Sequence, residues 1–170
     1  MTPRAAKPRD PAKPLAGTEL PEARETRELI TVLGRSGRPI IVGPWLSEAG
    51  FELLYWIPFL RWFAERYSVP EERLIAISRG GASAWYGSIA GRSHDALEVM
   101  SLEAFRARNE DRSDRLGEQK QIRVSPLDDE LLGWVRRAEG CDLAVLHPSM
   151  MYYLFAQYWW GHAPLAWVRR

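Results

Sequence analysis

The chain has 170 residues, of which 46% are hydrophobic and 26% are charged, and its formal net charge is +1. This length and composition suit one globular domain and exclude disordered, collagen-like and coiled-coil chains. The near-zero net charge gives no bulk attraction to polyanions, so we expect no nucleic-acid partner. The chain has 1 Cys and 3 His at spacings that fit no metal motif, so we expect no metal site and no cofactor.

The first 20 residues are rich in Pro, Lys and Arg and lack the apolar stretch of a secretory signal. They predict a disordered, mildly basic arm, and residues 21–170 predict one domain. Residues 143–168 contain no charged side chain, but Pro148, Gly161 and Pro164 interrupt this stretch. A spanning helix needs about 20 apolar residues in a row, so we expect no transmembrane span and a cytoplasmic location.

The first half of the domain begins with a helix, a strand and a second helix. Residues 22–34 have apolar side chains at helical spacing, and residues 40–42 form a β-branched run typical of a buried strand. Residues 43–50 predict a loop. Residues 51–67 carry a second helical stripe, in which Pro58 predicts a kink or the first turn.

The middle of the chain predicts two more strands. Residues 74–78 form a buried apolar run, followed by a glycine turn and a short helix over 83–90. Residues 96–100 predict a third strand. Ser101 has the chemistry of an N-cap for a helix that ends near residue 108.

The last third predicts a loop, a helix, a strand and a helix. Residues 109–121 are highly charged without an apolar stripe, which predicts an exposed loop. Ser125 then caps a helix that a glycine ends at residue 140, and residues 142–146 form a strand. The final helix runs from Pro148 to about residue 160.

Alternating short strands and helices predict an α/β fold, a Rossmann-like three-layer domain with a mainly parallel sheet. Ligands of such sheets bind at the carboxyl ends of the strands. The loops that follow the strands, at residues 43–50, 78–83 and 147–149, are therefore the places where we expect a site.

The first loop and the helix after it carry the spaced motif G-x-E-L-x-x-W-x-P-x-x-R. Its residues are Gly50, Glu52, Leu53, Trp56, Pro58 and Arg61. The motif resembles the opening of GT-B glycosyltransferases of the heptosyltransferase-like kind, with a looser likeness over residues 39–160. The resemblance implies that this chain is the N-terminal, acceptor-binding half of a GT-B fold.

The resemblance also implies a reaction and a catalytic residue. The reaction would transfer a sugar to a sugar or glycan acceptor, with Glu52 as the catalytic base. The alternative for Glu52 is a helix-capping role. A GT-B enzyme binds its nucleotide-sugar donor on a second domain, for which this chain has no room. We therefore expect donor binding only where a second domain is supplied, and little or no turnover by this chain alone.

The remaining site residues follow the predicted strands, and we expect them around one cleft together with Glu52. Candidate substrate-binding residues are Gly43, Trp45, Gly50, Arg79, Gly80 and His147. Glycines admit a ligand close to the backbone, and an Arg can hold a phosphate or a carboxylate. The alternatives are a tight turn with a surface Arg79 and a core or capping role for His147.

Two other functions compete with sugar transfer. The C-terminal segment is crowded with aromatic residues, which also suits a non-catalytic module that binds a partner protein. The same surface with the basic arm would suit a membrane-surface module. We expect apolar surface near residues 158–167, and with it self-association.

Overall fold

The computed structural model describes residues 19–117 and 120–159. Its four-stranded sheet has the order β3-β2-β1-β4, and every neighbouring pair of strands is parallel. The strands are β1 (Ile40–Val42), β2 (Leu74–Ser78), β3 (Arg92–Asp95) and β4 (Ala144–Leu146). The predicted Rossmann-like parallel sheet is confirmed. Nearly all of the predicted arm, and the predicted aromatic surface from residue 160 on, lie outside the described residues.

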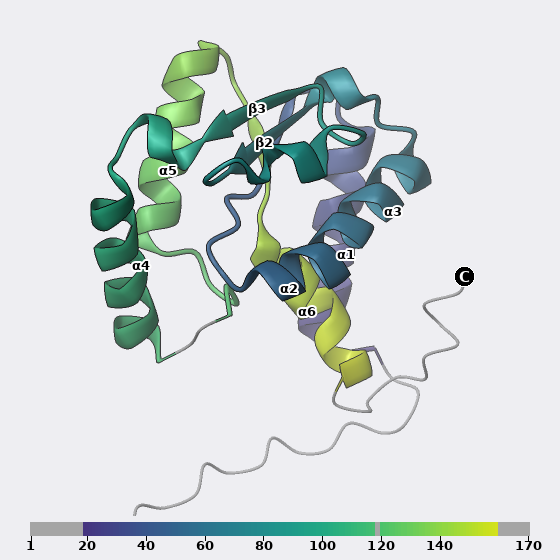
Figure 1. Cartoon of the computed structure of the whole chain (residues 1–170). Helices are drawn as coiled ribbons and strands as arrows, with labels where there is room; N and C mark the ends of the chain where they lie inside the picture. Colours follow the sequence, from purple (N-terminus) through teal and green to yellow (C-terminus); the bar gives the residue numbers. More distant parts are fainter. Residues whose placement is uncertain (1–18, 118–119, 160–170) are drawn as a thin grey trace, which may run out of the picture.

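Helices cover both faces of this sheet (Figure 1). One face is covered by α1 (Pro21–Arg35), α3 (Ile57–Tyr67) and α6 (Pro148–Trp159). The other face is covered by α5 (Pro126–Glu139), and α4 (Leu102–Leu116) packs against α5 on the outside. These three layers bury the sheet from both sides, as parallel sheets require.

The residues of β1 alternate between the two layers, which explains why this strand is apolar throughout. Ile40 and Val42 of β1 pack with the cluster under α1, α3 and α6, whereas Ile41 packs with Leu132 and Val135 of α5. Successive side chains of a strand point to opposite faces, so the positions of a strand covered on both sides are mostly apolar.

A continuous helical segment over residues 49–67 follows β1. It consists of α2 (Ala49–Phe51), the π-helical turn η1 (Glu52–Trp56) and α3. Pro58 lies in the first turn of α3, directly after the π turn. Proline has no N–H group and its ring crowds the preceding turn, and a widened turn relieves this conflict. The predicted first-turn position of Pro58 is confirmed.

The third strand was predicted at the wrong residues. It spans Arg92–Asp95, and residues 96–98 form the 3₁₀ turn η4 (Ala96–Glu98) instead. β3 lies at the edge of the sheet and pairs only with β2, so its side chains are exposed or half-buried. An edge strand needs no apolar run, and a polar sequence such as Arg-Ser-His-Asp gives no strand signal.

The predicted loop over residues 109–121 is wrong for most of its length, because α4 continues to Leu116. Ser101 caps this helix as predicted, its Oγ accepting from Ala104 N at 3.2 Å. Polar side chains replace the missing apolar stripe. Asn109 Nδ2 donates to Leu46 O at 2.9 Å, and Arg112, which is 4% exposed, donates to Asn109 Oδ1.

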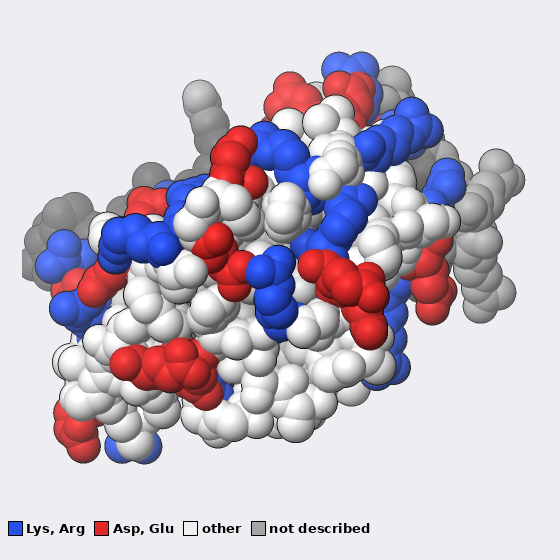
Figure 2. Space-filling view, turned by 90° about the horizontal axis from the view of Figure 1, so that it is seen from above, with Lys and Arg blue, Asp and Glu red and all other residues white. Residues whose placement is uncertain are grey.

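The surface of the described residues gives no sign of a membrane-crossing segment. None of the helices between residues 19 and 159 combines the length and apolarity that a span through a bilayer requires. The face seen from above carries acidic and basic side chains interspersed with one another, next to a broad uncharged area (Figure 2). This face therefore presents no extended field of one sign.

Candidate functional site

The loop that follows β1, residues 43–48, is the centre of the polar structure at the carboxyl edge of the sheet. Its first residue, Gly43, has φ +117° and donates its N–H to Leu146 O at 3.1 Å. A Cβ at this position would lie 3.2 Å from Ile77 O. Gly43 is therefore required for the close approach of β1 to β2, and it is buried.

Trp45, the loop tryptophan predicted to bind substrate, lies in the core with 1% of its surface exposed. Its ring stacks on Trp56 at 5.9 Å and on Tyr152 at 6.3 Å. Its Nε1 donates to Glu48 O at 3.1 Å, which closes the loop on itself. In this structure Trp45 anchors the loop and has no open face for a ligand.

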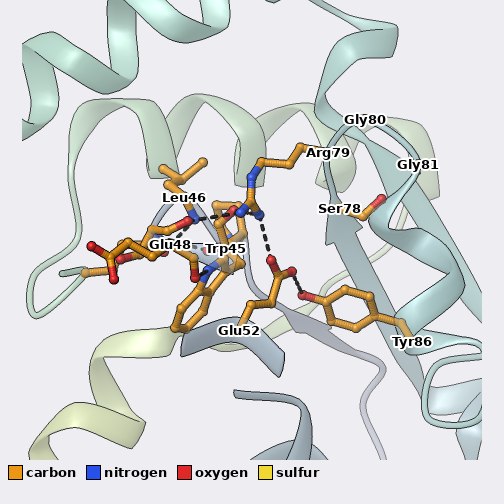
Figure 3. Close-up of polar contacts among 12 residues, drawn as sticks. Trp45, Leu46, Glu48, Glu52, Ser78, Arg79, Gly80, Gly81 and Tyr86 are labelled. Carbon is orange, nitrogen blue, oxygen red and sulfur yellow. Dashed lines mark hydrogen bonds and ion pairs between the residues drawn. The ribbon is translucent and has the colours of Figure 1, made fainter. Parts of the chain in front are cut away.

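Arg79, which follows β2, holds the loop from one side (Figure 3). Its Nη1 donates to Trp45 O at 2.7 Å, and its Nη2 donates to Ser47 O at 3.0 Å. Nη1 also donates to Glu52 Oε2 at 2.9 Å. The guanidinium thus joins the turn after β2, the loop and the helix after the loop. The Arg79 side chain stays 20% exposed.

Glu52 lies at the start of the π turn and is completely buried. Its second oxygen, Oε1, accepts from Tyr86 Oη at 2.6 Å. Burial raises the pKa of Glu52, while the positive charge of Arg79 and the hydrogen bonds from Tyr86 and Arg79 act against this rise. Both oxygens accept hydrogen bonds, which is the behaviour of an ionised carboxylate. We call Arg79, Glu52 and Tyr86 the Arg79 cluster.

The glycine turn after Arg79 is occupied by a carboxylate of the protein itself. Gly80 and Gly81 both have positive φ, and their N–H groups donate to Asp95 Oδ1 and Oδ2, each at 3.0 Å. Burial acts to raise the pKa of Asp95, but the N–H groups of Gly81, Leu97 and Gly80 lower it by more. The turn is thus a backbone anion site that Asp95 already fills.

A small pocket of about 270 Å³ lies beside this turn, at the head of the helical segment 49–67. Its lining residues, which define the Trp85 pocket, are Ala49, Arg79, Gly80, Gly81, Ala82 and Trp85. This volume lies just below the usual size range for small-ligand sites. Two predicted site residues, Arg79 and Gly80, line it, and exposed Gly50 directly follows a lining residue.

Trp85 is the residue of this pocket that sequence reasoning missed. It lies in the 3₁₀ turn η3 (Ala82–Tyr86), and 36% of its surface is exposed. Every other tryptophan in the described residues has an aromatic ring partner, whereas Trp85 has none. The signal in the sequence was its position just after a strand and a double-glycine turn.

His147 does not join the Arg79 cluster. Its Nδ1 accepts from Ser149 N at 3.1 Å and lies 2.9 Å from Ser149 Oγ. Since Nδ1 accepts, Nε2 carries the proton and donates to Asp128 Oδ1 at 3.0 Å. His147 is 4% exposed and does not line the Trp85 pocket. The predicted cleft therefore brings Glu52 and Arg79 together and leaves His147 in another group.

That second group holds the same loop from the other side. Gln121 Nε2 donates to both Asp128 Oδ1 and Pro44 O at 2.9 Å, and Gln121 Oε1 accepts from Leu46 N at 2.6 Å. Asp128 Oδ2 also accepts from Ser125 N at 2.7 Å, as part of a capping box that begins α5. We call this group the Asp128 cluster; its members are Gln121, Ser125, Asp128, His147 and Ser149.

In the Asp128 cluster, Ser149, His147 and Asp128 are linked in the order of a catalytic serine, its base and its acid. The cluster is, however, closed to substrate. Asp128 is fully buried and Ser149 is 8% exposed. Burial acts to raise the pKa of Asp128, but His147 and Ser125 lower it by more. The cluster joins α5, β4, α6 and the loop, and Asp128 is part of the capping box at the start of α5.

In the parts of the chain that the structure describes, no group of three or more His, Cys, Asp or Glu side chains could hold a metal ion. Comparison of the chain with protein-family models, curated proteins and solved structures found no match. The site geometry is therefore the basis for a functional assignment.

Proposed function

We propose that this chain is a glycosyltransferase-like domain that binds a sugar or glycan acceptor in the Trp85 pocket. The observation that carries the proposal is an indole ring, without an aromatic partner among the described residues, in a pocket at the carboxyl edge of a parallel sheet. This edge is where α/β domains bind ligands. Sugar rings present apolar C–H faces that pack well against an aromatic side chain.

The rigid surroundings of the pocket support this role. The backbone oxygens of residues 44, 45, 46 and 47 all accept hydrogen bonds from side chains outside the loop. A loop held this firmly fixes the position of Arg79, which lines the pocket, before a ligand arrives. Such preorganisation reduces the entropy lost on binding.

Glu52 as catalytic base stays a prediction. A base must come within hydrogen-bond reach of the acceptor hydroxyl. Both Glu52 oxygens are engaged by Arg79 and Tyr86, so the residue would have to leave these partners first. In the state described here, Glu52 is a positioning residue that orients Arg79 at the pocket wall.

Transfer also needs a place for a nucleotide-sugar donor. The Trp85 pocket is too small for a dinucleotide-sized ligand together with an acceptor. We assign the donor to a second domain supplied by another protein or by another part of the same gene product. By itself the chain binds the acceptor and turns over nucleotide sugars poorly.

The acceptor proposal is tested by glycan binding. The 170-residue chain is applied to a glycan array, and a bound oligosaccharide is titrated by calorimetry against wild type, Trp85→Ala and Trp62→Ala. Trp62 is a matched control because it is 38% exposed on α3 and stacks on Phe59 outside the pocket. We expect Trp85→Ala to weaken binding about five- to tenfold. Equal affinities for the two variants, or no glycan bound, would contradict the proposal.

The catalytic prediction has its own test. Turnover of nucleotide sugars is measured for the wild type and for Glu52→Gln, alone and with candidate partner domains. A base role requires that Glu52→Gln abolish whatever turnover is found. Robust turnover by the chain alone would contradict the need for a second domain.

A second candidate function is a non-catalytic module that self-associates. The observation that favours it is an apolar surface in which Leu54 is 72% exposed and Leu53 is 45% exposed. Tyr55 continues this surface through ring contacts with Phe51 at 5.0 Å and Trp159 at 5.7 Å. We expect the wild type to sediment as a dimer or larger species and Leu54→Glu to sediment as a monomer. A monomeric wild type at high concentration would remove this candidate.

A further inference from the structure

The one cation that lines the Trp85 pocket, Arg79, has its charge matched inside the protein. Its guanidinium forms an ion pair with fully buried Glu52 at 2.9 Å, and two backbone carbonyls accept its other hydrogen bonds. A phosphate or carboxylate ligand would have to compete with Glu52 for this guanidinium. Arg79 is therefore a poor anchor for an anion, contrary to what its position in the sequence indicates.

The second feature that would hold an anion, the glycine turn, is also satisfied from within. The N–H groups of Gly80 and Gly81 point to the two oxygens of Asp95. An incoming anion would have to displace this carboxylate and would meet its charge. Around the pocket the carboxylates of Glu52 and Asp95 outnumber the guanidinium of Arg79, so the local charge opposes an anionic ligand.

What stays open in the pocket is the aromatic surface of Trp85. This ring is 36% exposed and has no aromatic partner in the described residues. An indole face gains its contact energy from apolar C–H groups and needs no charge on the ligand. The pocket volume of about 270 Å³ leaves room for a single ring lying on it.

We infer that the Trp85 pocket selects an uncharged sugar residue and discriminates against sugars that carry phosphate or carboxylate groups. The inference rests on the proposed function and adds the chemical class of the acceptor. It also separates the two substrates of a transferase, because the charged nucleotide diphosphate of a donor would be excluded from this pocket.

The test uses the full chain on a glycan array that carries neutral, uronate-containing and phosphorylated glycans. The best neutral oligosaccharide is then titrated beside its 6-phosphate counterpart. We expect the neutral form to bind at least about tenfold more tightly, which corresponds to about 1.4 kcal/mol. We also expect its affinity to change less than about twofold between low and high salt, because no ligand charge is involved.

The outcomes distinguish the inference from the function on which it rests. Tighter binding of phosphorylated or uronate glycans, weakened by salt, would overturn the inference and leave glycan binding standing. Binding of no glycan of any class would overturn both. Neutral binding that Trp85→Ala does not weaken would place the sugar elsewhere and would also overturn the inference.

A charge variant tests the physical cause. In Glu52→Gln the side-chain amide can donate to the Tyr86 hydroxyl and its oxygen can accept from Arg79, while the positive charge of Arg79 loses its partner. We expect the 6-phosphate form to gain about fivefold in affinity relative to the neutral form. Asp129→Asn removes the same charge at an exposed position of α5 and is the matched control. An unchanged preference in Glu52→Gln would overturn the inference.

Discussion

The Arg79 cluster and the Asp128 cluster hold the same loop from opposite sides, but only one of them opens to solvent. Both are centred on a carboxylate that is completely buried, Glu52 in one and Asp128 in the other. The Arg79 side chain keeps 20% of its surface exposed and forms a wall of the Trp85 pocket. In the Asp128 cluster the side chain of His147 keeps only 5%.

This difference separates a structural role from a ligand-binding role. Buried polar groups are expensive unless every donor and acceptor is satisfied, and a closed cluster that is fully satisfied can only specify the fold. A cluster with one exposed member also specifies the fold, and in addition it presents that member to a ligand. The predictions below measure how far the two clusters differ.

Of the two clusters, the closed one is expected to lose more stability when its carboxylate is removed. Asp128→Ala leaves Ser125 N and His147 Nε2 without an acceptor in the interior, and it removes one of the two acceptors of Gln121 Nε2. We expect the free energy of unfolding to fall by about 3–5 kcal/mol, measured by urea denaturation. Asp129→Asn, which changes an exposed neighbour in the same helical turn, should cost less than about 1 kcal/mol. Similar losses for both variants would mean that the cluster does not stabilise the fold.

A smaller loss is expected at the open cluster. Glu52→Ala removes the acceptor of Tyr86 and the charged acceptor of Arg79, but part of Arg79 can turn to water. We expect a loss of about 2–3 kcal/mol for Glu52→Ala and about 1 kcal/mol for Glu52→Gln, which keeps both hydrogen bonds. A loss for Glu52→Ala above that of Asp128→Ala would reverse the comparison of the two clusters.

The two carboxylates should also respond to pH in opposite directions. The folded-state pKa of Asp128 is lowered from 3.8, so its contribution to stability is full above that value and is lost as the pH falls through the folded-state pKa. The folded-state pKa of Glu52 is raised from 4.5, so its contribution is full below 4.5 and declines as the pH rises through the folded-state pKa.

These signs are measured as differences in unfolding free energy between the wild type and each amide variant across the acidic range. The difference between wild type and Asp128→Asn should grow as the pH rises through the region below 3.8. The difference between wild type and Glu52→Gln should shrink as the pH rises above 4.5. If both differences in unfolding free energy grew with pH, the opposite directions of the two pKa shifts would be contradicted.

The sequence supported the fold better than it supported the site. Apolar runs at residues 40–42 and 74–78 and the Ser-Pro start of α5 were sufficient, because burial on both faces and helix capping leave local signals. The parallel alternation also predicted correctly that Glu52 and Arg79 would meet. The edge strand β3 left no such signal, because half of its surface stays open.

What the sequence could not show are contacts between residues far apart in the chain. Gln121, in a segment without any motif, forms hydrogen bonds with Leu46 and Pro44. Tyr86, in a short 3₁₀ turn, donates a hydrogen bond to Glu52. For the same reason the sequence could not distinguish a buried tryptophan from an exposed one. Trp45 in a loop is core and Trp85 in another turn is open, and only their neighbours in space distinguish them.

The smallest effect on stability is expected at Trp85, where the effect on binding is the one that matters. Trp85 is 36% exposed and has no aromatic partner in the part of the chain that the structure describes, so Trp85→Ala should lower the free energy of unfolding by less than about 1 kcal/mol. Trp45→Ala, at a ring that is 1% exposed and stacked on two others, should cost about 3–5 kcal/mol. A large stability loss in Trp85→Ala would show that its ring packs as core does and would remove it as a ligand platform. A folded Trp85→Ala variant with five- to tenfold weaker glycan binding would place the ligand in the Trp85 pocket, because the variant would keep its fold while its affinity for the glycan falls.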